Sequence, residues 1–158
     1  MSNPIASPLP GALPDAYLET LHAYDALNAS LRVGNKVALL AALASSGITH
    51  VVVSFDGYGD SGQIETVEAR AGDAPVDLPD TTVAIGEAEM GDPEPVTRDL
   101  PLGDAIEHLA YDCLAATHCG WENGDGAYGE FVFDVAAGTI TLDHNDRHTA
   151  VETYNHSF

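Results

Sequence analysis

The sequence predicts an α+β domain, with a mainly antiparallel sheet of about four to six strands packed against about three helices. Two observations predict this class. Apolar residues recur at helical spacing near the start and again after residue 100, and β-branched runs bounded by turn residues occupy most of the remainder. The chain has 158 residues, 45% of them hydrophobic, which is enough for one domain with its own core. We therefore expect residues 14–158 to form a single domain.

The N-terminal part is expected to be an arm followed by two helices. Residues 1–13 contain three prolines and should form a flexible arm. Proline suits the first position of a helix, so a helix is expected to begin at Pro14. Its apolar residues recur at helical spacing: Tyr17, Leu18, Leu21, Tyr24, Leu27 and Leu31. Gly34 interrupts this pattern, and Asn35 can cap a second helix that ends at Gly47.

The strands are predicted from β-branched and aromatic runs that glycine, proline and aspartate interrupt. Residues 48–55 and 63–70 should pair as a hairpin across a long glycine- and aspartate-rich turn at 56–62. A short strand is expected at 82–85. A third helix follows, with one apolar stripe made of Leu102, Ile106, Leu109 and Cys113. Three more strands complete the sheet: 131–135, 139–143 and 148–154.

Charge is the most unusual property of the chain. It has 25 acidic and five basic residues, for a formal net charge of -20. Residues 1–50 carry a net charge of only -1, whereas residues 51–100 carry -10 and residues 101–158 carry -9. Such a chain repels phosphate groups, which excludes direct binding to nucleic acid and to anionic membranes. The near-neutral helical part could pack against a partner or form a homo-oligomer.

The sequence also predicts a cytoplasmic, reduced protein. No apolar run approaches the roughly 20 residues that a membrane span needs, and residues 1–14 lack the basic and apolar regions of a secretory signal. Cys113 and Cys119 are too few for a disulfide framework. On one helix they would lie about 9 Å apart along the axis, beyond the roughly 7 Å limit for a disulfide.

Two glycine-rich loops contain oxygen ligands of the kind that calcium prefers. The candidate ligands are Asp56, Asp60, Glu65, Asn123 and Asp125. Neither loop fits the register of an EF-hand: glycines fall at the first and third ligand positions of the first loop, and Trp121 occupies the first position of the second. The alternative interpretation is a pair of turns whose carboxylates bind backbone N–H groups, with Trp121 packed over the sheet.

Other chemical sites have weaker support in the sequence. His118, Cys119, His144 and His148 could hold zinc only if the fold brings them together. A hydrolase that uses Asp56, Asp60 and His118 lacks any nucleophile motif around Ser61. No phosphate-binding loop of the Walker type is present, because the single lysine, Lys36, lies in a helical segment. We therefore assign no catalytic residue and expect no cofactor, with calcium as the alternative.

Two segments carry a resemblance to a known family. VSFDGYGDSGQIE at 53–65 and HCGWENGDGAYGEF at 118–131 resemble an uncharacterised family of small acidic bacterial proteins associated with plasmids, phages and integrative elements. The resemblance spans residues 35–150 and implies no established activity or catalytic residues. It implies a context, because mobile elements carry many small acidic inhibitors of host defence such as CRISPR or restriction systems.

These observations lead to a hypothesis of nucleic-acid mimicry. Folded carboxylates can imitate a phosphate array, so an acidic protein can occupy the basic, nucleic-acid-binding surface of a partner protein. The candidate partner-binding residues lie in the acidic stretch with little periodicity: Asp73, Asp77, Asp80, Glu87, Glu89, Asp92, Glu94 and Asp99. Two alternatives remain open. One is a calcium-binding module, and the other is an acidic composition that reflects adaptation to high salt.

Overall fold

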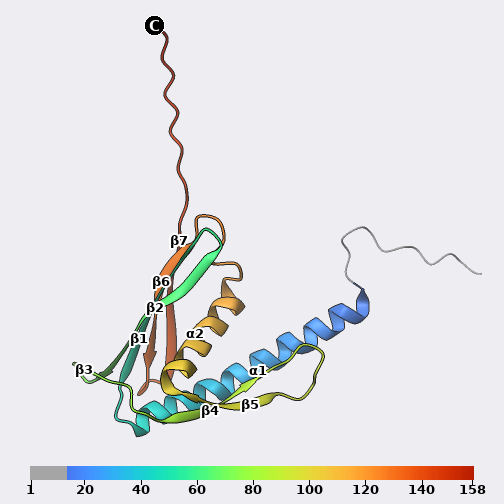
Figure 1. The fold of residues 1–158 in the computed structure, drawn as a ribbon, viewed down its shortest axis with the longest axis vertical. Coiled ribbons are helices and arrows are strands. Elements are labelled where there is room, and N and C mark those ends of the chain that lie inside the picture. The colour runs from blue at the N-terminus through green and yellow to red at the C-terminus, as the bar shows by residue number, and fades with distance from the viewer. Residues whose placement is uncertain (1–13) are drawn as a thin grey trace, which may run out of the picture.

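The computed structural model describes residues 14–158, so the predicted arm at 1–13 lies outside the described residues. Figure 1 shows an α+β architecture, as predicted. The elements follow the chain in this order: α1 (Asp15–Ser45), β1 (His50–Tyr58), β2 (Ser61–Ala71), β3 (Ala74–Val76), β4 (Thr82–Glu87), β5 (Val96–Pro101), α2 (Leu102–Thr117), β6 (Ala127–Asp134) and β7 (Thr139–Asp146).

The first two predicted helices are one continuous helix, α1, which runs through Gly34. A single glycine in a helix costs only about 1 kcal/mol, less than a second nucleation would. Asn35 is not a cap, because its side chain bonds to Gly86 of β4 instead. The C-terminal end agrees with the prediction: the helix ends at Ser45, and Gly47 has a φ of 76°. The described residues thus contain two helices.

Five strands form one antiparallel sheet in the order β3-β2-β1-β6-β7, and β4 pairs with β5 in a separate hairpin. The predicted pairing of β1 with β2 is confirmed, but the turn is short rather than long. It consists of Gly59 and Asp60, whose φ values of 58° and 65° suit a tight two-residue turn. The residues expected in a loop at 56–62 therefore extend the two strands.

The core lies between the helices and one face of the five-stranded sheet. Leu39 and Leu43 of α1 and Leu109 of α2 are fully buried in the same cluster as Phe131 and Phe133 of β6. Figure 1 shows both helices on one side of the sheet, with the N-terminal half of α1 extending beyond it. Neither helix of the described part is long and apolar enough to cross a membrane.

Two strand predictions differ from the structure. Residues 148–154 were expected to complete the sheet, but the sheet ends with β7 at Asp146, and these residues are exposed and pair with no strand of the described chain. Conversely, β5 is a strand that its acidic, proline-flanked sequence did not indicate. It forms because it pairs along its whole length with β4, from Thr82 opposite Pro101 to Glu87 opposite Val96.

Candidate functional site

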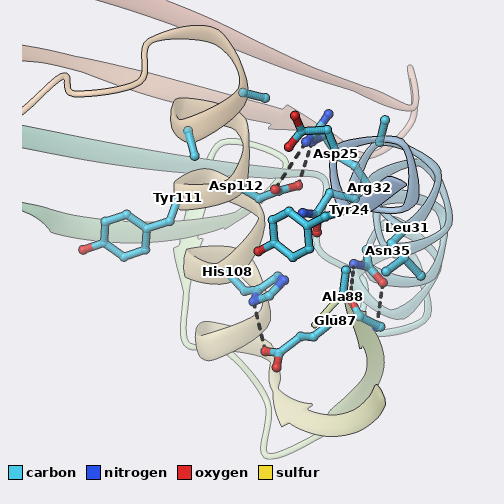
Figure 2. Close-up of a pocket in the computed structure, with 15 residues that line it drawn as sticks. Tyr24, Asp25, Leu31, Arg32, Asn35, Glu87, Ala88, His108, Tyr111 and Asp112 are labelled. Atoms are coloured by element: carbon cyan, nitrogen blue, oxygen red, sulfur yellow. Dashed lines mark hydrogen bonds and ion pairs between the residues drawn. The ribbon is translucent and has the colours of Figure 1, made fainter. Parts of the chain in front are cut away.

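A cleft of about 770 Å³ opens between α1, α2 and the end of β4. Figure 2 shows polar side chains converging on it from these three elements: Tyr24, Arg32, Asn35, Glu87, His108 and Asp112. Tyr111 also lies at its margin, but its ring points away from the others. The Tyr111 hydroxyl accepts a hydrogen bond from the backbone N–H of Ile64, at 2.9 Å, and so joins α2 to β2.

An ion pair between Arg32 and Asp112 joins the two helices across this cleft. Arg32 Nε donates to Asp112 Oδ2 at 2.7 Å, and Arg32 Nη2 donates to Asp112 Oδ1 at 3.3 Å. About a quarter of each side chain is exposed, 28% for Arg32 and 24% for Asp112. The hydrogen bond to Asp112 raises the pKa of Arg32 above its ordinary value, so the guanidinium stays charged. Two-point contact of this kind fixes direction as well as distance.

Asn35 joins α1 to β4, because its side-chain amide makes the two backbone hydrogen bonds that a neighbouring strand would make. Its Nδ2 donates to the Gly86 carbonyl at 2.9 Å, and the Gly86 N–H donates to Asn35 Oδ1 at 2.9 Å. Asn35 is 6% exposed, and this reciprocal pair satisfies its buried amide. The lack of a side chain at Gly86 suits this close approach, because a Cβ would stand 2.8 Å from Leu31 Cδ2 and the leucine would have to shift.

Glu87 is the one predicted partner-binding residue that lies in the cleft. It accepts a hydrogen bond from Arg98, and its Oε1 is 3.5 Å from His108 Nδ1. Two ion pairs thus lie at the cleft: Arg32 with Asp112, and Glu87 with Arg98, which lies outside the lining. This arrangement makes the cleft a polar junction that holds two helices and a hairpin together.

The other predicted partner-binding residues are all exposed, but they fall into separate groups. Asp73, Asp77 and Asp80 lie beside β3 and on the chain that leads to β4. Glu89, Asp92 and Glu94 lie on the loop between β4 and β5, and Asp99 lies on β5 opposite Ala84. In Figure 1 the β4–β5 loop runs beside α1, on the opposite side of the molecule from β3. The structure therefore does not combine the eight residues into one array.

A second acidic surface, which sequence reasoning missed, covers the face of the sheet opposite the helices. We call this the open sheet face; its carboxylates belong to Asp56, Glu68, Glu130, Asp134 and Asp143. Asp56 is paired with Arg147 and Glu68 with Arg70, whereas the other three have no arginine partner in residues 14–158. At its centre, Ser54 of β1 stands between Thr66 and Glu130, and Glu130 stands directly opposite Asp143. The sequence signal for the open sheet face is in β6, where Glu130, Val132 and Asp134 alternate with the buried Phe131 and Phe133.

The two glycine-rich motifs meet at one end of the sheet, where Trp121 covers the β1–β2 hairpin. A Cβ on Gly57 would stand 2.6 Å from Trp121 Cζ3, and one on Gly62 would stand 2.5 Å from Trp121 Cη2. The Trp121 ring also meets Phe55 edge-on, with centroids 5.4 Å apart. The prediction that Trp121 packs over the sheet is confirmed.

Backbone hydrogen bonds join the same two motifs. Gly59 N–H donates to the Gly124 carbonyl at 3.1 Å, and Asp60 N–H donates to the Glu122 carbonyl at 3.0 Å. A Cβ on Gly126 would stand only 1.7 Å from the Gly57 carbonyl oxygen. The glycines therefore permit close backbone contact, which is the structural role of these motifs.

The five candidate calcium ligands lie at this end of the sheet, where several already have partners. Asp56 Oδ1 is 2.8 Å from Arg147 Nη1, and Asp125 Oδ2 accepts a hydrogen bond from the Thr149 N–H at 2.7 Å. Hydrogen bonding with Thr149, through its side chain and then its backbone N–H, lowers the pKa of Asp125. Asp60 and Glu65 are exposed, and Asn123 lies on the loop. Within residues 14–158, no group of three or more His, Cys, Asp or Glu is placed to hold a metal ion.

The fold brings two of the four candidate zinc ligands into contact, but as a stack. The rings of His118 and His144 lie parallel, with centroids 3.6 Å apart. His144 Nε2 is 2.9 Å from Asp146 Oδ1, whereas its Nδ1 is buried with no hydrogen-bond partner in the described part of the chain. Cys119 is exposed; Cys113 is half-buried, and burial raises the pKa of its thiol.

The fold and surface together define an acidic α+β domain with an uncovered sheet face. The chain belongs to a family of unknown function, DUF6878, whose model matches residues 31–158. This range contains both glycine-rich motifs and leaves out the first half of α1. No curated protein and no solved structure matches the chain.

Proposed function

We propose that this protein is a non-enzymatic, cytoplasmic inhibitor that binds the basic, nucleic-acid-binding surface of another protein. The observation that supports the proposal best is the surplus of carboxylates in the folded chain. All four arginines are in ion pairs with acidic residues: Arg32 with Asp112, Arg70 with Glu68, Arg98 with Glu87 and Arg147 with Asp56. Of the 25 acidic residues, 21 are thus left without an arginine partner in residues 14–158.

The open sheet face suits a basic partner better than the scattered acidic stretch does. Carboxylates that stand directly opposite each other, as Glu130 and Asp143 do, destabilise a sheet. An arginine or lysine of the partner, placed between them, would relieve this repulsion. The free energy that the repulsion costs the isolated fold would then be recovered when the complex forms. Val52 and Val132 pair on the same face and offer partly exposed apolar area beside the carboxylates. The β4–β5 loop, with Glu89, Asp92 and Glu94, is a second candidate surface.

The resemblance to proteins of mobile elements suggests what the partner is. A plasmid or phage protein benefits from blocking a host nuclease or a CRISPR or restriction complex, and such proteins present basic clefts to nucleic acid. An acidic decoy is steered to these clefts by the same field that attracts DNA or RNA.

A capture experiment with matched variants tests the proposal. The immobilised protein is exposed to host lysate at low and at raised salt, with calcium and chelator arms. We expect it to capture a nucleic-acid-binding defence protein that salt releases and that its own DNA or RNA displaces. The triple variant Glu68→Gln, Glu130→Gln, Asp143→Asn should lose this capture, whereas Glu89→Gln, Asp92→Asn, Glu94→Gln should retain it.

Three results would count against the proposal. One is capture that does not weaken with salt, and another is capture that nucleic acid does not displace. The third is equal capture by wild type and by both triple variants, because the bound surface would then lie elsewhere. Stabilisation by calcium alone, with no captured protein, would instead favour the calcium-binding module.

A further inference from the structure

Residues 147–158, which we call the C-segment, include a run with the composition of a strand, but within the described range 14–158 they pair with no strand. Four of the six residues at 149–154 are β-branched or aromatic: Thr149, Val151, Thr153 and Tyr154. Figure 1 shows the segment continuing from β7 away from the rest of the molecule. Val151 is 82% exposed and Tyr154 is 75% exposed. The family match includes these residues, so they are part of the recognised domain.

The start of the C-segment is held in place. The Arg147 N–H donates to the Gly126 carbonyl at 2.9 Å, and Arg147 Nη1 donates to the Gly57 carbonyl at 3.1 Å. The Thr149 N–H then donates to Asp125 at 2.7 Å. These contacts fix the direction in which the following residues leave the sheet.

The sheet itself has an unpaired edge beside this segment. β7 is the last strand in the order, and among residues 14–158 no strand faces its eight residues on one side. Ile140 and Leu142 of β7 pack on the core and are only partly buried. The opposite edge is better protected, because β3 covers Ala69–Ala71 and the Tyr111 hydroxyl binds the Ile64 N–H. A long unprotected edge strand favours pairing with another strand.

We propose that two copies of this chain associate through β7 and the C-segment, with residues 149–154 of each copy pairing antiparallel with β7 of the other. The free edge and the unpaired strand are consecutive in one chain. A single two-fold axis near Arg147 therefore satisfies both at once and joins two five-stranded sheets into one. The backbone supplies the hydrogen bonds, as in other cases of strand addition.

The charge of the C-segment is compatible with a second copy of the chain pairing at the β7 edge. The charge of the whole chain also predicts a salt dependence that distinguishes this dimer from a complex with a basic partner. The C-segment contains one acid, Glu152, and one base, Arg147, so it brings no net charge to the β7 edge. The complete copies still repel each other, since each carries -20. Added salt should therefore strengthen the dimer, whereas it should weaken binding to a basic partner. The two proposals can thus fail independently.

Sedimentation velocity on the full chain tests the dimer. We expect a species of about twice 16.5 kDa, more populated at about 1 M NaCl than at about 0.15 M. Val151→Pro should raise the dimer dissociation constant at least about 100-fold, because proline fixes φ at about -65° and bends the segment out of the extended conformation that strand pairing needs. Ser157→Pro, beyond the paired residues, is the matched control and should dimerise as the wild type does.

Hydrogen exchange provides an independent readout. The backbone amides of Ala150, Glu152 and Tyr154 alternate with the Arg147 and Thr149 amides that bond within the chain, so they face the partner. They should be protected in the wild type and unprotected in Val151→Pro, while the far-UV circular dichroism of the two proteins stays the same. A wild type that is monomeric at hundreds of micromolar overturns the proposal. So does a dimer that survives Val151→Pro, because its interface would then lie on another surface such as α1.

Discussion

Gly62 shows how single residues determine the end of the sheet, because Trp121 occupies the space that a side chain would need. A Cβ at Gly62 would stand 2.5 Å from the Trp121 ring, so Gly62→Ala must displace the ring from Phe55. We expect a loss of roughly 1–3 kcal/mol in the free energy of unfolding, measured by urea denaturation. Gly34→Ala is the control: nothing lies within 4 Å of its added Cβ, and it should stabilise α1 by roughly 0.5–1 kcal/mol. Equal effects would contradict the assigned role of Trp121.

Asn35 makes a second prediction at the residue scale. Asn35→Ala leaves the N–H and carbonyl of Gly86 without their partners, at a position where Asn35 itself is 6% exposed. We expect a loss of roughly 1–3 kcal/mol in the free energy of unfolding. Asn28→Ala, two turns earlier on the same helix, should change it by less than half as much, because no side-chain hydrogen bond of Asn28 is seen in residues 14–158. A neutral Asn35→Ala would show that β4 is held by packing alone.

The role of such residues could be predicted only in part from the sequence. The sequence identified the two glycine-rich motifs, and it correctly predicted that Trp121 packs over the sheet. Asn35 was misassigned as a helix cap because its local context fits one, whereas its partner, Gly86, lies 51 positions away. Contacts between distant segments carry no local signal.

At the scale of elements, β6 and β7 place like charges opposite each other. Removing one of these charges should therefore stabilise the fold and weaken partner binding. Glu130→Gln removes one member of the Glu130–Asp143 pair, so the free energy of unfolding should rise by roughly 0.2–1 kcal/mol. The same variant should capture less partner. Glu65→Gln, on β2 away from this pair, is the control and should do neither. A destabilised Glu130→Gln would contradict this account of the open sheet face.

Element types were predicted better than element boundaries, for a physical reason in each case. The hairpin of β1 and β2 was predicted because its first strand is β-branched and apolar and its turn is rich in glycine. The helix break at Gly34 was wrong, since packing of both halves of α1 outweighs the cost of one glycine. Residues 148–154 have strand composition, yet a strand also needs a neighbour, and the part of the chain that the structure describes supplies none. The open sheet face required knowledge of register, which no single strand reveals.

At the scale of the whole molecule, the net charge of -20 sets the response of the fold to salt. Carboxylates on one small domain repel one another, and this repulsion weakens as the Debye length falls from about 30 Å at 0.01 M salt to about 8 Å at 0.15 M. We therefore expect Tm to rise over this range of NaCl and then to level off by about 1 M. Val151→Pro is the protein to use, since it removes the contribution of self-association.

This curve also separates two explanations of the acidic composition. A protein adapted to high salt would continue to gain Tm up to molar concentrations, whereas a mesophilic acidic decoy gains only what screening provides. The triple variant Glu68→Gln, Glu130→Gln, Asp143→Asn, combined with Val151→Pro, should show a smaller rise below 0.15 M, because fewer carboxylates remain on the open sheet face. If the combined variant and Val151→Pro alone rise equally, the repulsion is distributed over the whole surface. If both rise steadily to about 1 M, adaptation to high salt explains the charge and the argument for a basic partner loses its main support.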